Sequence, residues 1–165
     1  MTATPPISTG KRLAAELRRA WHGAPWHGPS VLEIVGRLTA AEAATRTARG
    51  SHTPWQIVLH LTTWVEAPRR RLDDPSFDPR EHEDFPVPTA LDAQAWARDV
   101  EALGVAIERL AAQVESMSDE VLAAPVGARP YTHTTMLDGV VQHLAYHAGQ
   151  VALLARPDAG SDRPS

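Results

Sequence analysis

The sequence predicts an all-α protein, a four-helix bundle with short accessory helices and a long loop between the second and third long helices. Four segments carry apolar residues at spacings of three and four, which place them on one face of a helix. Most of these segments begin with residues that cap helices. No segment sustains the alternation of apolar and polar residues that a half-buried strand requires.

The first long helix follows a polar lead-in, residues 1–8. Its apolar face consists of Leu13, Leu17, Ala20 and Trp21. Gly23 and Pro25 end it, because neither residue type continues a helix well. Two sequences of the capping-box type follow, at residues 30–33 and 39–42, and each predicts a short accessory helix.

The second long helix has a strong start signal. Thr53 is the expected cap, Pro54 occupies the first helical position, and Gln56 completes a capping box. We expect this helix to run to about Leu72. Pro68 is expected to kink or shorten it, because proline lacks the N–H that an interior helical position donates.

Residues 73–88 predict an extended loop, since they contain four prolines and six acidic residues against a single arginine. We expect Phe77 and Phe85 to anchor this loop on the bundle. Thr89 with Asp92 is the expected cap of the third long helix.

The third long helix repeats apolar residues with a seven-residue period across residues 96–114, which predicts bundle packing at a crossing angle near +20°. Ser118 opens a short turn of helix. The last helix is expected to be capped at residues 135–138 and stopped by Pro157. We therefore expect residues 1–157 to form a single helical-bundle domain and residues 158–165 to form a flexible tail.

The composition narrows the classes of partner. A net charge of −4 argues against a general nucleic-acid binder, which would carry a basic surface. The chain has no apolar run long enough for a membrane span and no signal-peptide pattern, so we expect a cytoplasmic protein that acts on a small molecule. Because there is no cysteine, any metal site must use His, Asp or Glu.

The chemistry-bearing feature of the chain is a histidine pair in the last helix, His143 and His147. Residues four apart lie on one face of a helix, and this face also carries Val140 and Val151, so we expect it to be buried. Buried imidazoles need bonding partners, which either a divalent metal or a polar core network provides. His60, at the edge of the apolar face of the second helix, is the candidate third ligand.

Three histidine ligands would leave coordination positions open, as in catalytic metal sites. A divalent ion bound by neutral imidazoles can lower the pKa of a bound water or hold a thiol as thiolate. Leu144 stands where zinc metalloproteases carry a glutamate directly after the first histidine, so we exclude that class. The last helix contains no glutamate, which argues against a ferritin-like di-iron site.

Tyr146 and Gln150 flank the histidine pair and are expected to bond a substrate or a ligand ring, or else to make polar contacts between helices. His27 lies in a compact turn that could approach the site, with capping or packing as the alternative. Arginines 69–71 are expected to form a solvated helix end, with attraction of an anionic substrate as the alternative. The remaining histidines are expected at the surface, namely His22, His52, His82 and His133.

Three blocks of the sequence resemble the DinB/YfiT-like family. They are Pro-Trp-His-Gly-Pro-Ser at residues 25–30, His-Thr-Pro-Trp-Gln-Ile-Val-Leu-His-Leu at residues 52–61, and Gln-His-Leu-Ala-Tyr-His-Ala-Gly-Gln at residues 142–150. The resemblance implies a four-helix bundle that is often a homodimer. It also implies a metal held by one histidine of the second helix and two of the last, roles that fall here on His60, His143 and His147.

Characterised members of that family include transferases and isomerases that use low-molecular-weight thiols such as bacillithiol, mycothiol or glutathione. The resemblance therefore implies a metal-dependent thiol S-transferase in detoxification or stress response, with zinc as the expected metal and nickel, iron or manganese as alternatives. Two other interpretations stay open. One is a hydrolase that uses metal-bound hydroxide, with a carboxylate from residues 73–84. The other is a non-catalytic, stress-induced dimeric helix bundle.

Overall fold

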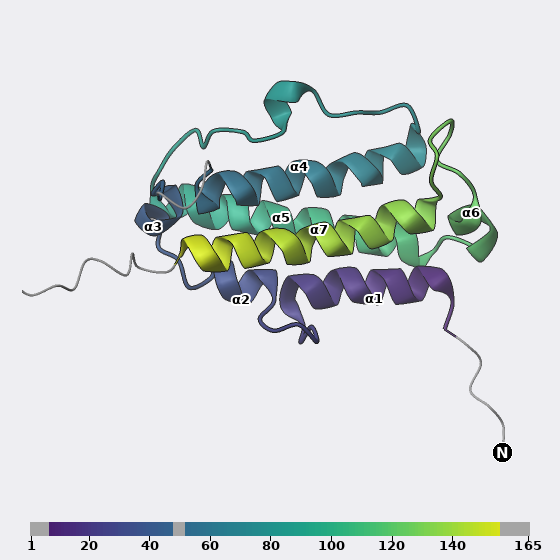
Figure 1. Ribbon diagram of the computed structural model, residues 1–165, viewed down its shortest axis with the longest axis horizontal. Helices are drawn as coiled ribbons and strands as arrows, with labels where there is room; N and C mark the ends of the chain where they lie inside the picture. The colour runs from purple at the N-terminus through teal and green to yellow at the C-terminus, as the bar shows by residue number, and fades with distance from the viewer. Residues whose placement is uncertain (1–6, 48–51, 156–165) are drawn as a thin grey trace, which may run out of the picture.

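Four long helices lie side by side as a bundle in the computed structural model, which describes residues 7–47 and 52–155 (Figure 1). They are α1 (Thr9–His22), α4 (Pro54–Asp73), α5 (Ala93–Glu115) and α7 (His133–Leu154). The connections carry α2 (Val31–Val35), α3 (Ala40–Ala44), a short 3-10 helix η1 (Glu81–Glu83) and α6 (Asp119–Ala123). The described residues contain no strand beyond an isolated bridge, so the predicted all-α bundle is confirmed.

Capping residues determine where several helices begin. The Thr53 side chain accepts a hydrogen bond from the backbone N–H of Gln56, and the Gln56 side chain accepts one from the N–H of Thr53. The same reciprocal arrangement opens α2 and α3, as their sequences predict. Each pair satisfies backbone donors that a helix start leaves without partners.

The end of α4 agrees with its prediction, because the helix continues past Pro68 to Asp73. Two predicted helix caps are wrong. The cap of α5 is Asp92 itself, and that of α7 is Thr132. A contact with α6 explains why α7 starts three residues earlier than predicted. The backbone N–H of His133 donates to the carbonyl of Ala124, which holds the first residue of α7 against the end of α6.

The core lies between the four long helices and is built from their apolar faces. α5 contributes Leu103, Ile107 and Leu110, all essentially inaccessible to solvent, in the repeat that its sequence predicts. Trp55 at the start of α4 is fully buried, and its indole N–H donates to Asp99 on α5 at 2.9 Å. No helix within the described ranges is long and apolar enough to cross a membrane.

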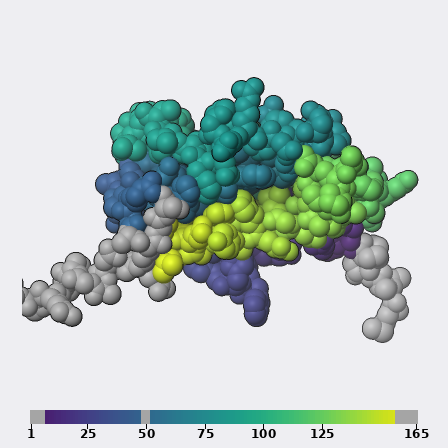
Figure 2. Space-filling view, turned by 45° about the horizontal axis from the view of Figure 1, so that its top comes forward, coloured from purple at the N-terminus to yellow at the C-terminus, as the bar shows by residue number. Residues whose placement is uncertain are grey.

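The long loop between α4 and α5 runs over α4, on the side of the bundle where α4 adjoins α7 (Figures 1 and 2). Both predicted anchors are confirmed. The guanidinium of Arg70 lies 3.9 Å from the ring centroid of Phe77, and Phe85 stacks on His60 with ring centroids 4.0 Å apart. The loop therefore covers the surface on which the candidate ligand His60 lies. The predicted tail, residues 158–165, is outside the described residues.

Two helical glycines allow a test of this packing. A Cβ at Gly104 would lie 2.9 Å from the ring of Trp21, whereas one at Gly149 would meet nothing within 4 Å. We expect Gly104→Ala to lose about 1–3 kcal/mol of unfolding free energy through overpacking. Gly149→Ala should gain up to about 1 kcal/mol from helix propensity. Urea unfolding followed by circular dichroism measures both, and equal stability of the two variants would contradict the α1–α5 contact.

Candidate metal centre

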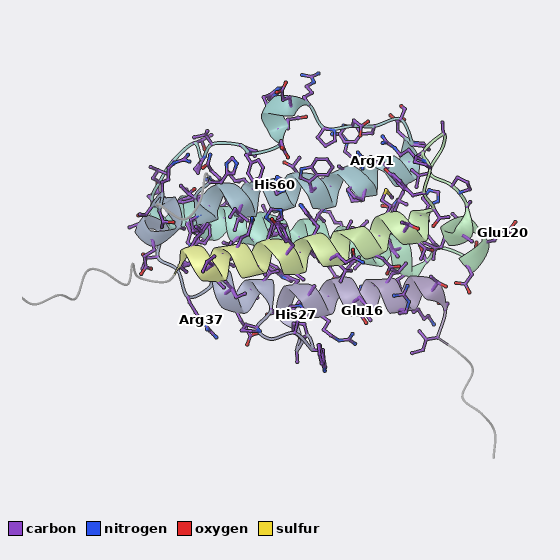
Figure 3. All side chains as sticks on the ribbon, in the orientation of Figure 1. Glu16, His27, Arg37, His60, Arg71 and Glu120 are labelled. Atoms are coloured by element: carbon purple, nitrogen blue, oxygen red, sulfur yellow. The ribbon has the colours of Figure 1, made fainter. Side chains whose placement is uncertain are left out.

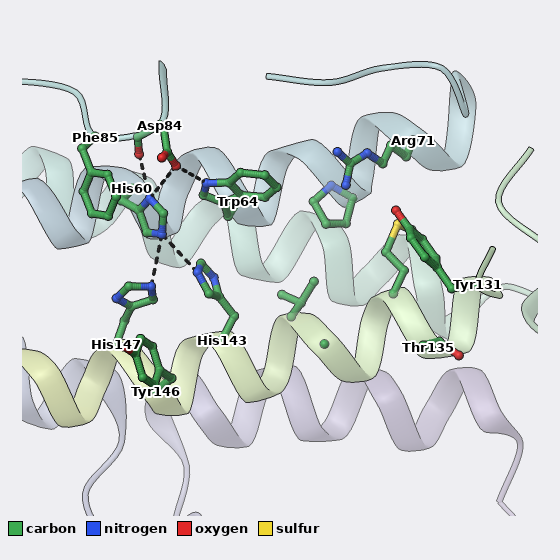
Figure 4. A pocket seen from close by; sticks show the side chains of 14 residues that line it. His60, Trp64, Arg71, Asp84, Phe85, Tyr131, Thr135, His143, Tyr146 and His147 are labelled. Atoms are coloured by element: carbon green, nitrogen blue, oxygen red, sulfur yellow. Dashed lines mark hydrogen bonds and ion pairs between the residues drawn. The ribbon is translucent and has the colours of Figure 1, made fainter. Parts of the chain in front are cut away.

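Three histidines from two helices converge on one point of the structure. His60 projects from α4, and His143 and His147 project from α7 (Figure 4). The Nε2 atom of His60 lies 3.1 Å from the Nε2 of His143 and 3.1 Å from the Nε2 of His147. His60 and His147 are buried and His143 is partly buried, so the structure brings together the three histidines that the sequence singled out.

In His60 and His147, the Nδ1 atom faces away from the other histidines, and its hydrogen bonds determine which ring nitrogen carries the hydrogen. The Nδ1 atom of His60 is 2.7 Å from the backbone oxygen of Asp84 and 3.1 Å from its Oδ1, both acceptors. The Nδ1 of His147 is 2.6 Å from Oε1 of Gln150. The Nδ1 of His60 must therefore carry the hydrogen, and the Nδ1 of His147 carries it with the Gln150 amide oriented as here, which in neutral imidazoles leaves a lone pair on each Nε2.

Two lone pairs then face each other at 3.1 Å between His60 and His147, an arrangement that repels unless a cation lies between them. A shared proton is disfavoured. Burial lowers the pKa of all three histidines, and burial together with the neighbouring histidines lowers the pKa of His143 to about 4. The imidazoles are therefore neutral near pH 7, the form that binds metals.

Two of the three separations between the ligand nitrogens, both measured from His60, fit one divalent ion. A metal ion lies about 2.0–2.1 Å from each imidazole nitrogen that binds it. Two such nitrogens are then about 2.8 Å apart when the nitrogen–metal–nitrogen angle is octahedral and about 3.4 Å apart when it is tetrahedral. The observed 3.1 Å separations lie within this range. Three imidazoles suit zinc, nickel, iron or copper, so the three-histidine cluster could hold a divalent metal, although the ligands alone do not select one.

The cluster opens into a pocket of about 660 Å³ between α4 and α7, which we call the histidine pocket (Figure 4). Its lining includes the largely apolar side chains of Trp64, Pro68, Met136 and Val140. Three protein ligands would leave coordination positions free, and here a largely apolar space adjoins them. The site can therefore place a small molecule beside a bound metal.

The loop supplies contacts around His60 that its sequence does not assign. Asp84 accepts a hydrogen bond from the indole N–H of Trp64 at 2.7 Å, which orients the carboxylate toward Nδ1 of His60. Phe85 covers one face of the His60 ring, and His52 stacks on the other face of Phe85 with centroids 3.7 Å apart. The acidic character of the loop signalled a carboxylate near the site, but not which one.

Gln150 takes one of its predicted roles, because it accepts the hydrogen of the His147 ring. Its amide nitrogen donates to the hydroxyl of Tyr146 at 3.2 Å, which directs the amide oxygen toward His147. Tyr146 lines the histidine pocket. Such outer contacts fix the ring orientation of metal-binding histidines.

The expectation that His27 approaches the site is wrong. Its turn lies beside α1 and the side of α7 that carries Gln142, away from His60 (Figure 3). His22 and His82 are exposed as predicted. His133 is buried, because its Nδ1 bonds to the backbone oxygen of Ala124, and His52 is partly buried against Phe85.

Arg71 is also not part of a solvated helix end. Its side chain is only 7% exposed and lines the histidine pocket. Its Nε donates to the backbone oxygen of Phe77 at 2.9 Å, and a terminal nitrogen pairs with Asp78. The sequence carries no signal that the Arg71 side chain is buried, because its burial depends on how the loop returns over α4.

Comparison with known proteins identifies one family. The family model of the DinB superfamily matches residues 26–151, which include all three clustered histidines. No curated protein and no solved structure matches the chain significantly.

Metal content tests the cluster directly. Protein purified without a histidine tag should carry about one divalent ion per chain, and His60→Ala should lose it because two imidazoles cannot replace the third ligand. His27→Ala, which removes an exposed histidine away from the cluster, should retain the metal. Elemental analysis measures all three proteins, with circular dichroism to verify folding. Full retention in His60→Ala would reject the three-histidine site.

Removing the bond that orients His147 should weaken metal binding without removing a ligand. We expect Gln150→Leu to lower metal affinity by about 10- to 100-fold. Gln142→Leu is the matched control, since Gln142 is exposed on the same helix and faces the turn of His27. Competition with a chromophoric chelator measures both affinities. Equal affinities would show that the Gln150 contact does not position the ligand.

Proposed function

Because this chain belongs to the DinB superfamily, we propose that it is a divalent-metal-dependent enzyme that transfers a low-molecular-weight thiol to an electrophilic small molecule. Detoxification of electrophiles is the use that fits this chemistry. The cluster of three histidines and the adjoining pocket support the proposal.

The observation that carries the proposal is the position of Asp84. Among the described residues it is the only carboxylate that lines the histidine pocket. It lies on the Nδ1 side of His60 and is bonded to Trp64, so it is directed away from the space between the three Nε2 atoms. The open side of the cluster therefore has no carboxylate that could act as a general base. This favours a reaction whose nucleophile the metal itself activates.

A divalent metal held by three neutral imidazoles supplies the required activation, since it lowers the pKa of a coordinating thiol and so favours thiolate near neutral pH. The chain's own residues prepare the site for this. Asp84 and Gln150 keep the hydrogens of His60 and His147 on Nδ1, which leaves both Nε2 atoms ready to bind. The apolar walls of the pocket offer a surface to the electrophile.

The two other interpretations are less well supported. The hydrolase interpretation includes a carboxylate from residues 73–84 beside the metal-bound hydroxide, and the one that lines the pocket, Asp84, is held behind His60 by Trp64. A non-catalytic bundle would need no pocket at the cluster. It would also retain the repulsion between the Nε2 lone pairs of His60 and His147 without a compensating cation.

Thiol transfer can be tested with zinc-loaded protein, a panel of cellular thiols and chlorodinitrobenzene as the electrophile. We expect accelerated conjugation with at least one thiol. The rate should return to the uncatalysed level in His143→Ala, because that variant loses a metal ligand. His27→Ala should keep the wild-type rate. The absence of acceleration with every thiol, in protein shown to contain metal, would reject the transferase proposal.

A further inference from the structure

The histidine pocket extends well beyond the three histidines, and its far end is cationic. Its α4 wall consists of His60, Trp64, Pro68 and Arg71. These residues follow one another at spacings of four, four and three, so they form one face of the helix. His60 and Arg71 are eleven positions apart, which is about 16 Å along the helix axis. Figure 4 shows Arg71 and the histidines at opposite ends of the pocket.

Three charged groups form what we call the Arg71 cluster, namely Arg71, Asp78 and Arg129. The carboxylate of Asp78 pairs with Arg71 through one oxygen and with Arg129 at 2.9 Å through the other. Two guanidinium groups therefore share one carboxylate, and the cluster keeps one net positive charge. Both arginines also donate to the backbone oxygen of Phe77, which holds the cluster in place.

Arg71 retains donor capacity toward the pocket. Its Nε and Nη2 are used by Phe77 and Asp78, whereas no partner for Nη1 occurs among the described residues. Because the side chain is 7% exposed and lines the pocket, a ligand within the pocket can reach it with little competition from bulk water. Charge-assisted hydrogen bonds are strong in such surroundings.

We propose that the histidine pocket binds an elongated molecule with a metal-binding group at one end, an apolar middle, and a carboxylate at the other end that bonds Arg71. The molecule follows from three parts of the pocket: the metal site, the walls formed by Trp64, Pro68 and Met136, and the Arg71 cluster. A carboxylate matches the single net charge of the cluster, whereas a dianionic phosphate would leave excess negative charge. This inference rests on the proposed function only in that a metal occupies the three-histidine site.

Hydroxamates test the inference independently of thiol transfer, because they bind divalent metals without reacting. The long probe is sebacic monohydroxamate, which carries a free carboxylate, and its comparison is the corresponding methyl ester. The zinc-loaded full chain should bind the acid roughly 10- to 100-fold more tightly than the ester, as measured by calorimetry. The short succinic monohydroxamate should show no such preference over its ester, since its carboxylate cannot reach Arg71.

Arg71→Met should abolish the preference for the long acid and leave the affinity for the ester unchanged. Arg70→Met is the matched control. It removes the same charge one residue away, but Arg70 is exposed, lies over Phe77 and is not among the residues that line the histidine pocket. That variant should keep the preference. Equal binding of acid and ester by the wild type, or a preference that survives in Arg71→Met, would overturn the proposal.

A variant of the pocket's middle covers the case in which Arg71→Met fails to fold. Gly139 lines the histidine pocket, and a Cβ there would meet nothing within 4 Å. Gly139→Leu should weaken both long hydroxamates about tenfold or more and leave both short ones unaffected. Unchanged binding of the long acid would overturn the proposal, as would failure of every hydroxamate to bind. A preference for the acid without conjugation activity would reject thiol transfer alone.

Discussion

The burial of three neutral imidazoles with converging Nε2 atoms is the constraint on which the rest of the site depends. Imidazoles in an apolar setting need partners for both nitrogens, and residues 7–47 and 52–155 provide oxygen acceptors only for the Nδ1 atoms of His60 and His147. The Nε2 lone pairs are then directed at one another. A metal ion would resolve this conflict, whereas a hydrogen on Nε2 of His143 could satisfy only one of the two lone pairs.

The loop between α4 and α5 is as much a part of the site as the helices. It delivers the Asp84 oxygens to His60, covers that ring with Phe85, and places Asp78 against Arg71. Acidic, proline-rich segments are commonly solvated, but this one is held by aromatic stacking and by buried guanidinium contacts. The loop thus supports the three-histidine end and the cationic end of the same pocket.

One face of α4 links these two ends. The helical period that places His60 over α7 also places Arg71 over it three turns later, with Trp64 between them. Pro68 lies in this stripe without ending the helix. Its ring removes one backbone donor, and packing of the neighbouring buried residues Val65 and Arg71 outweighs that loss. The result is an elongated pocket rather than an isolated metal site.

The sequence by itself determined what depends on contacts within a turn or two of chain: the four long helices, the capping boxes of α2, α3 and α4, and the placement of His143 and His147 on one face. Local hydrogen bonds and the 3.6-residue period govern these features, so a linear pattern reveals them. The prediction that His60 lies beside His143 and His147 required the further assumption that the helices pack as a bundle.

Only the tertiary structure decided which groups surround the cluster. Asp84 reaches His60 from 24 residues away, Arg71 turns inward because the loop returns over α4, and the turn of His27 packs on the other side of α7. These outcomes depend on the path of irregular segments between helices. That path is determined by packing between residues distant in the sequence, which no local periodicity encodes.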